Sequence, residues 1–248
     1  KGWYFRDDFT RTALLATPTL STEAYYNNGW KAFGSANGTL VGAFIENGMG
    51  LVAPESDTDQ GIGFATLALP YKIARGQGDL WFECRLKNSV ITDTENGFVV
   101  GLWEQQTLSA TVPIAAAGTL ADANFVGFHR LEGDGNQIDT VYKANGQTQV
   151  TVDTDCLENC PTTTALVADT YIKLGMRYTD RQHHAGAYQM QWFINGFELP
   201  DRYTVTATAG NPFPNDVQLG ICIAMLLASN NDSVLTIDWV ECAQLAAS

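Results

Sequence analysis

Charge is scarce in this sequence, and basic charge is the scarcest. Only 17% of the 248 residues are charged, against roughly 25% in a typical globular domain. Acidic residues outnumber basic ones by 27 to 14, which gives a formal net charge of -13. Nucleic-acid binding needs clustered Lys and Arg to neutralise phosphates, so the composition excludes a nucleic-acid partner. It leaves room for a bound cation or a basic partner.

Long apolar runs are also absent. The longest, "LGICIAMLLA" at 219–228, has the length of a strand, whereas a bilayer-spanning helix needs roughly 20 apolar residues. We therefore expect no membrane partner.

Helical periodicity is missing throughout. Short apolar runs, many of them bounded by Asn-Gly or other turn residues, follow one another along the chain. This pattern predicts an all-β fold of two antiparallel sheets packed as a sandwich. No repeat or linker divides the chain, so we expect a single domain over residues 1–248 with an irregular N-terminal segment of about residues 1–30.

Two stretches predict different strand environments. In "DLWFECRLK", the apolar residues Leu80, Phe82, Cys84 and Leu86 alternate with Trp81, Glu83, Arg85 and Lys87. This alternation predicts a strand with one wet face. In "LGICIAML" both faces are apolar, which predicts a central strand that is covered on both sides.

The stretch "MQWFINGFEL" at 190–199 predicts a β-hairpin. Asn195-Gly196 suits a two-residue type I′ turn, in which both central residues have positive φ. Met190, Trp192 and Ile194 then share the core face of the first strand. Phe193 and Phe197 remain open to a partner.

Five cysteines leave at least one thiol unpaired within the chain. Cys84, Cys222 and Cys242 lie in expected strands and are interpreted as small buried hydrophobic residues. Cys156 and Cys160, in "DCLENCP", leave three alternatives open: a disulfide, two free thiols or a metal site.

Several motifs resemble those of concanavalin A-like jelly-roll domains of the laminin-G and glucanase type. They are "FRDDF" near the start, Trp81 to Leu86, Gly97 to Leu102, Trp192 to Gly196 and Leu235 to Val240. The resemblance covers nearly the whole chain and implies this fold. The segments "VGFHRLEGDGNQIDTVYKANG" and "ADTYIKLGMRYTD" are most similar to versions in virion proteins of tailed bacteriophages.

The catalytic pattern of the resembling glucanases is missing. A retaining glucanase of this type is expected to carry Glu-x-Asp-x-Glu on one strand, so that both carboxylates flank the glycosidic bond. No such triplet occurs, and in "IDWVE" Asp238 and Glu241 are three residues apart and face opposite ways. Hydrolysis would require an acid and a base from separate strands. We therefore expect no enzymatic activity.

Metal and lectin sites remain alternatives. Glu55, Asp57 and Asp59, and likewise Asp153 and Asp155, alternate in a manner that could hold Ca²⁺, although solvated acidic loops are the simpler interpretation. His129, His183 and His184 form no recognisable catalytic or metal motif. Trp30, Trp103, Tyr25 and Tyr26 are conceivable sugar platforms, although Trp in a sandwich is usually part of the core.

The resemblance and the missing catalytic set favour a non-enzymatic virion protein. We expect a capsid decoration or cement protein that binds the major capsid protein and sibling copies on the capsid surface. Capsid symmetry favours a homo-oligomer, for example a trimer at a threefold position. The expected contact residues are Trp3, Tyr4, Phe5, Tyr25, Tyr26, Phe193 and Phe197, together with the loop at 107–123. The alternative is a lectin-like carbohydrate-binding module, free or on a virion. No cofactor is expected, and a structural Ca²⁺ is the alternative to solvated acidic loops.

Overall fold

The computed structural model describes thirteen stretches of the chain, and every structural statement below concerns them. They are residues 2–9, 24–26, 29–34, 39–42, 48–52, 60–91, 96–104, 114–115, 119–131, 133–180, 188–206, 210–227 and 233–246. Every regular element that these residues form is a β-strand. They contain no helix long and apolar enough to cross a bilayer.

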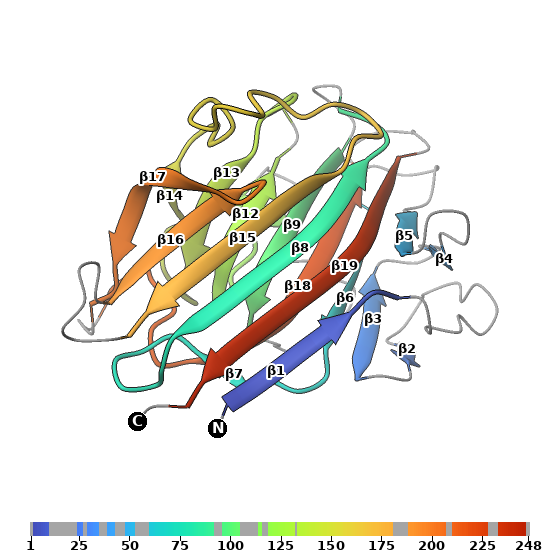
Figure 1. Cartoon of the computed structure of the whole chain (residues 1–248). Helices are drawn as coiled ribbons and strands as arrows, with labels where there is room; N and C mark the ends of the chain where they lie inside the picture. The colour runs from blue at the N-terminus through green and yellow to red at the C-terminus, as the bar shows by residue number, and fades with distance from the viewer. Residues whose placement is uncertain are drawn as a thin grey trace.

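One layer is an eight-stranded antiparallel sheet (Figure 1). Its strand order is β17-β16-β15-β8-β19-β5-β4, and β1 pairs with β19 beside β5. The strands are β1 (Gly2–Asp7), β4 (Thr39–Gly42), β5 (Met49–Val52), β8 (Leu80–Asn88), β15 (Ile172–Thr179), β16 (Gln189–Ile194), β17 (Phe197–Thr204) and β19 (Val234–Leu245).

The other layer is a nine-stranded antiparallel sheet with the order β14-β13-β12-β9-β18-β6-β3-β2, in which β7 pairs with β18. Its strands are β2 (Ala24–Tyr26), β3 (Trp30–Gly34), β6 (Gln60–Thr66), β7 (Tyr71–Lys72), β9 (Asn96–Trp103), β12 (Phe125–Arg130), β13 (Asp139–Lys143), β14 (Val150–Asp153) and β18 (Gln218–Leu227). A two-stranded ribbon, β10 (Ile114–Ala115) with β11 (Thr119–Leu120), completes the described strands.

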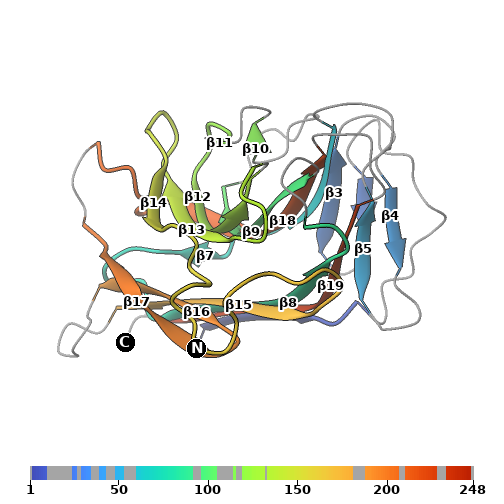
Figure 2. The same ribbon diagram turned by 90° about the horizontal axis from the view of Figure 1, so that it is seen from above.

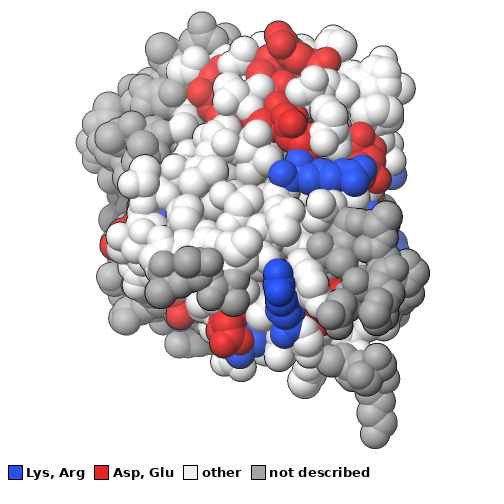
Figure 3. All heavy atoms as spheres, turned by 90° about the vertical axis from the view of Figure 1, so that its left-hand side faces the viewer, with Lys and Arg blue, Asp and Glu red and all other residues white. Residues whose placement is uncertain are grey.

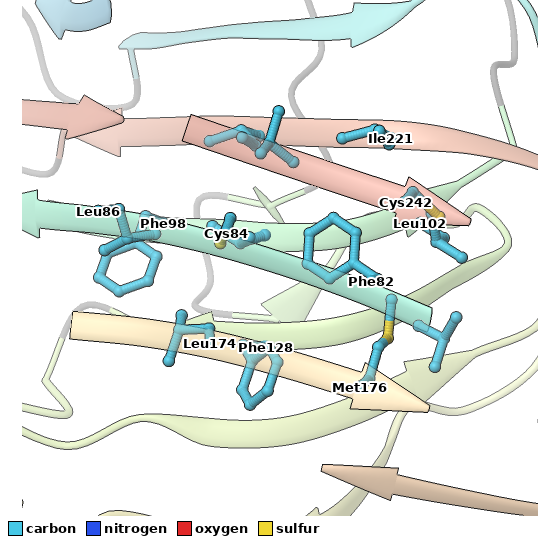
Figure 4. Packing of buried hydrophobic residues seen from close by; sticks show 14 of the residues in the cluster. Phe82, Cys84, Leu86, Phe98, Leu102, Phe128, Leu174, Met176, Ile221 and Cys242 are labelled. Atoms are coloured by element: carbon cyan, nitrogen blue, oxygen red, sulfur yellow. The ribbon is translucent and has the colours of Figure 1, made fainter. Parts of the chain in front are cut away.

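The two sheets pack face to face, as the view from above in Figure 2 shows. Alternation along β8 sends Phe82, Cys84 and Leu86 inward. Figure 4 shows these side chains meeting Phe98 and Phe128 from the opposite sheet. The predicted wet face is confirmed, because Trp81 is 37% exposed and Glu83, Arg85 and Lys87 are only partly buried.

A second apolar layer covers the outer face of the nine-stranded sheet. Cys222, Ala224 and Leu226 of β18 belong to a cluster separate from the main core, in which Leu120 and Ala123 pack over the sheet. Ile221, Ile223 and Met225 point into the main core. The prediction that this strand is central and covered on both sides is confirmed.

The hairpin prediction is also confirmed. Asn195 and Gly196 have φ of 51° and 83° between β16 and β17. Met190, Trp192 and Ile194 are fully buried. Trp192 is therefore a core residue.

One expectation needs correction, and one set of alternatives is decided. Residues 2–7, expected to be irregular, form β1, because their backbone pairs with residues 240–245 of β19. Cys156 and Cys160 are free, buried thiols, which excludes the disulfide in this structure. The expected burial of Cys84, Cys222 and Cys242 is confirmed.

Candidate functional site

Two rows of side chains cross the outer face of the eight-stranded sheet, which faces the viewer in Figure 1. The antiparallel register aligns the first row as Phe193, Gly175, Glu83, Glu241 and Arg6. The second row is Gln191, Arg177, Trp81, Ala243 and Tyr4. Directly opposed residues have Cβ atoms roughly 5 Å apart, so the strands β16, β15, β8, β19 and β1 all contribute to one continuous surface.

The rows are hollowed where their residues are small. Gly175 has no side chain and Ala243 has only a methyl group, so larger neighbours form walls around both positions. The resulting cavity, called the outer-face pocket below, has a volume of about 380 Å³. Its lining is Tyr4, Trp81, Phe82, Glu83, Gly175, Met176, Arg177, Phe193, Gly196, Glu241, Cys242 and Ala243.

Three aromatic rings from different strands border the outer-face pocket. Tyr4 is 67% exposed and Trp81 is 37% exposed. Phe193 is partly buried, and its ring centroid lies 5.7 Å from the guanidinium carbon of Arg177. The pocket therefore presents aromatic surface to solvent beside charged groups.

The two carboxylates of the outer-face pocket are paired locally. Lys173 Nζ lies 3.6 Å from Glu83 Oε1. Arg6 Nη1 and the Tyr4 hydroxyl each donate to Glu241 Oε2 over 3.4 Å. Each of these two pairs is close to electroneutral, unlike the chain as a whole.

Arg177 is held in place by an amide. Its Nε and Nη2 donate to Gln191 Oε1 over 2.9 and 2.6 Å. Gln191 Nε2 in turn donates to Glu198 Oε1 over 2.7 Å. The guanidinium at the pocket wall thus has a fixed orientation, and its remaining N–H groups can donate to a ligand.

Glu83 and Glu241 stand directly opposite each other on β8 and β19. From the sequence, glycoside hydrolysis requires an acid and a base on separate strands, and this pair of carboxylates has that arrangement. Their side chains are 31% and 32% exposed, so both stand on an open face of the sheet.

A second group of ionisable residues lies where β12 and β13 meet. His129 and Asp139 are paired across these strands, and Asp134 comes from their connection. The metal-ligating atoms of the three residues all lie within 4.8 Å of one another. Arg130 fixes the connection by donating to the Gly135 carbonyl oxygen.

Hydrogen bonds determine the tautomer of His129. The backbone N–H of Leu120 donates to Gln149 Oε1 over 2.8 Å, so the Gln149 amide nitrogen, 2.8 Å from His129 Nε2, is the donor there. The proton of the neutral ring then sits on Nδ1, which is buried without a hydrogen-bond partner and lies 4.0 Å from Asp139 Oδ2. Asp134 and Asp139 are therefore the side chains suited to bind a cation.

Burial dominates the titration of this cluster. It lowers the pKa of His129 to about 4 and raises the pKa of Asp139 to about 6, with further increases from the neighbouring carboxylates of Asp134, Asp155 and Asp153. Burial also raises the pKa of Asp134, against the opposing effect of Arg130. The cluster therefore holds protons that exposed carboxylates would lose.

The expected solvated loop at Asp153 and Asp155 is wrong. These residues are 6% and 8% exposed. Asp153 accepts two hydrogen bonds from Asn159, and the Asp155 backbone N–H donates to Asp139. Figure 3 shows acidic side chains gathered near the top of one side of the molecule. Glu55, Asp57, Asp59, His183 and His184 lie outside the described residues.

The structure separates the contact residues expected from the sequence. Tyr4 and Phe193 meet in the outer-face pocket, whereas Phe5 is partly buried against Trp30 with ring centroids 5.2 Å apart. Trp3 and Phe197 are 65% and 40% exposed outside this pocket. Of Tyr25 and Tyr26 only the backbone, in β2, is described. Trp30 and Trp103 are buried and cannot serve as platforms.

Sequence reasoning missed the combination of Trp81, Glu83, Gly175, Arg177 and Glu241. The alternation in β8 did place Trp81 and Glu83 on a wet face. The register that brings β15 and β19 beside them left no local signal in the sequence.

Comparison with known proteins identifies the fold. No family model and no curated protein sequence matches the chain. A protein of unknown function from Shewanella oneidensis MR-1 has a similar structure, with a TM-score of 0.57 and 12% identity over 99% of this chain and 87% of that one. Bacillus licheniformis β-glucanase matches with a TM-score of 0.53 and 14% identity over 97% and 98% of the two chains. Peanut lectin matches with a TM-score of 0.51 and 12% identity over the whole of both chains.

These likenesses show the fold alone. The chain is a concanavalin A-like antiparallel sandwich, which confirms the fold predicted from the sequence.

Proposed function

We propose that this chain is a carbohydrate-binding module whose ligand occupies the outer-face pocket. The observation that carries the proposal is the composition of that pocket: the rings of Tyr4, Trp81 and Phe193 stand beside Glu83, Glu241 and Arg177. Aromatic surface packs against the apolar face of a sugar ring, while a few convergent polar groups bind its hydroxyls. Gly175 provides the space in which such a ring would lie.

The fold is consistent with this proposal. Peanut lectin and a β-glucanase, both carbohydrate-related proteins by name, share the architecture over nearly the whole chain. Fold alone does not carry function, so the support from these two proteins is secondary to the composition of the pocket.

We propose binding without cleavage. A glycosidase general acid is typically enclosed in apolar surroundings that keep it protonated. Here Glu83 lies beside Lys173 and Glu241 beside Arg6, and both stand on an open sheet face. Because Glu83 and Glu241 stand opposite each other, hydrolysis is the alternative that an experiment has to exclude.

The prediction of a capsid decoration protein rests on the sequence resemblance, and it stays a prediction. A carbohydrate-binding module on a virion would be compatible with both functions. Co-sedimentation with purified capsids tests the capsid contact directly: protein left in the supernatant would contradict it.

Affinity electrophoresis against a panel of neutral and acidic polysaccharides tests the proposed function. We expect at least one neutral polysaccharide to retard the protein, and Trp81→Ala to lose most of the retardation. Val167→Ala is the control for loss of an exposed apolar side chain, because Val167 is 58% exposed and does not line the pocket. Equal losses in the two variants, or no retardation by any polysaccharide, would overturn the proposal.

Reducing-end release from the retained polysaccharide distinguishes binding from hydrolysis. We expect none from the wild-type protein. Release that disappears in both Glu83→Gln and Glu241→Gln would instead identify the opposed pair as catalytic.

A further inference from the structure

Two more hollows adjoin the outer-face pocket around strand β1. The first, called the edge groove, has a volume of about 560 Å³ and lies between β1 and the residues from Thr66 to Tyr71. The second, called the end hollow, has a volume of about 460 Å³ and lies where Gly2 meets Leu245 and Ala246. In Figure 1, β1 runs beside β19 with the two chain ends close to its start.

Shared residues connect the three hollows. Tyr4 lines both the outer-face pocket and the edge groove. Trp3, Pro70 and Gln218 line both the edge groove and the end hollow. A ligand that leaves the pocket over Tyr4 therefore enters the groove directly.

Exposed apolar side chains mark this path. Trp3 and Tyr4 follow each other on β1, so they point to opposite faces of the strand, yet they are 65% and 67% exposed. Leu67, across the edge groove, is 41% exposed. The two aromatic rings thus lie on either side of the strand, one facing the pocket and the other facing the groove.

Most of the charged side chains that line the path have a partner of opposite charge, and Arg177 is held by the neutral amide of Gln191. Among the described residues that line the edge groove, none is charged. Lys72, in the end hollow, has its Nζ 2.7 Å from Asp216 Oδ1. Since the carboxylates of the outer-face pocket also have cationic neighbours, and Arg177 has N–H groups left to donate to hydroxyls, the path suits an uncharged polar ligand.

We propose that the ligand is an extended, uncharged polysaccharide, bound along its interior from the outer-face pocket over Tyr4 and around β1 into the edge groove. This inference rests on the proposed function and adds to it the class and length of the glycan. Consecutive sugar units then occupy the connected hollows. Trp3 is then the platform for units beyond the pocket.

Isothermal titration with oligosaccharides of increasing length, from disaccharide to decasaccharide, tests the inference. The series is prepared from a neutral polysaccharide that retards the protein. We expect the wild-type affinity to rise with length until the path is filled. Trp3→Ala should lower the affinity for the longest oligosaccharide about three- to tenfold, the loss expected for one aromatic contact, and leave disaccharide affinity unchanged. Trp81→Ala should weaken binding at every length.

Val167→Ala is the control for removal of an exposed apolar side chain, since Val167 is 58% exposed and lines none of the three hollows. If affinity depends on Trp81 but not on length, this inference fails and the proposed function stands. If no oligosaccharide binds, the proposed function fails. If β1 instead mediates self-association in sedimentation velocity, and association competes with the longest oligosaccharide, the groove is a protein interface and the inference is overturned.

Discussion

Gly175 controls the shape of the outer-face pocket at the scale of a single residue. A Cβ added there would lie 3.4 Å from the Phe82 carbonyl oxygen, 3.5 Å from Phe193 Cβ and 3.6 Å from Glu83 Cγ. These are ordinary van der Waals distances, so a methyl group would occupy the floor of the pocket without displacing the backbone. Gly175 therefore allows ligand access to be tested with little change to the fold.

Gly175→Ala is expected to weaken glycan binding about tenfold while leaving the thermal midpoint of unfolding within a few degrees of wild type. The methyl group removes the space for the ligand, and its new contacts stay within normal packing distances. Titration calorimetry and a thermal melt measure the two effects. Unchanged affinity in a folded Gly175→Ala protein would place the ligand elsewhere.

His129 and Asp139 have opposite effects on how stability depends on pH. The folded-state pKa of Asp139 is raised to about 6, so its contribution to stability is fully present below the unfolded pKa of about 4 and is lost as pH rises through 6. The pKa of His129 is lowered to about 4. Its contribution is fully present above the unfolded pKa of about 6.5 and is lost as pH falls toward 4.

Replacing one of these residues should therefore leave the effect of the other visible in how the free energy of unfolding depends on pH. Relative to wild type, the free energy of unfolding of Asp139→Asn should increase from pH 4 to pH 6. That of His129→Gln should decrease over the same range. Each change is on the order of 2 kcal/mol, from the usual conversion of pKa units into free energy. Urea denaturation at several pH values measures both. If the free energy of unfolding changed with pH in the same way in both variants and in the wild type, the two pKa shifts could not belong to His129 and Asp139.

The β16–β17 hairpin shows how one element depends on a single turn residue. Asn195 has a left-handed backbone with φ of 51°, which Asn tolerates better than most residues. Its backbone N–H donates to the Lys173 carbonyl oxygen over 2.9 Å, and its side-chain oxygen accepts from the Lys173 N–H over 2.9 Å. Its side-chain nitrogen donates to Thr163 Oγ1 over 2.7 Å. Asn195 thus joins the hairpin to β15 as well as turning the chain.

Asn195→Ala is expected to destabilise the protein by about 1 to 3 kcal/mol, because it loses the side-chain hydrogen bonds and places a Cβ-bearing residue with lower tolerance at positive φ. Asn195→Gly removes the same hydrogen bonds but keeps the turn conformation, so it should be destabilised less. Chemical denaturation compares the two. A glycine variant at least as unstable as the alanine variant would show that backbone strain contributes nothing.

Sequence periodicity could predict individual elements but not their combination. The wet face of β8, the doubly covered β18 and the Asn195-Gly196 turn follow from alternation and turn chemistry, which are local properties. Glu83, Gly175 and Glu241 are far apart in the chain, and only the register of three strands brings them into one row. The burial of Asp153 and Asp155 also has no signal in their alternation, because it depends on packing that brings Asn159 and Asp139 to them.

At the scale of the whole molecule, the two sheets expose different outer faces. The second apolar cluster covers the outer face of the nine-stranded sheet around β9, β12 and β18. The outer face of the eight-stranded sheet carries partly exposed aromatic and charged side chains in aligned rows. Among the described strands, the outer face of the eight-stranded sheet is therefore the surface that we expect to bind a ligand.

The central claim is that a sugar lies on the open sheet face over Gly175. A crystal structure of the protein with the highest-affinity neutral oligosaccharide tests it most directly. We expect a pyranose ring packed against Trp81, within hydrogen-bonding distance of Glu83 or Arg177, with the chain continuing past Tyr4 toward Trp3. A glycan bound to the nine-stranded sheet or to the acidic cluster at Asp134 and Asp139, with the outer-face pocket filled only by water, would contradict the account.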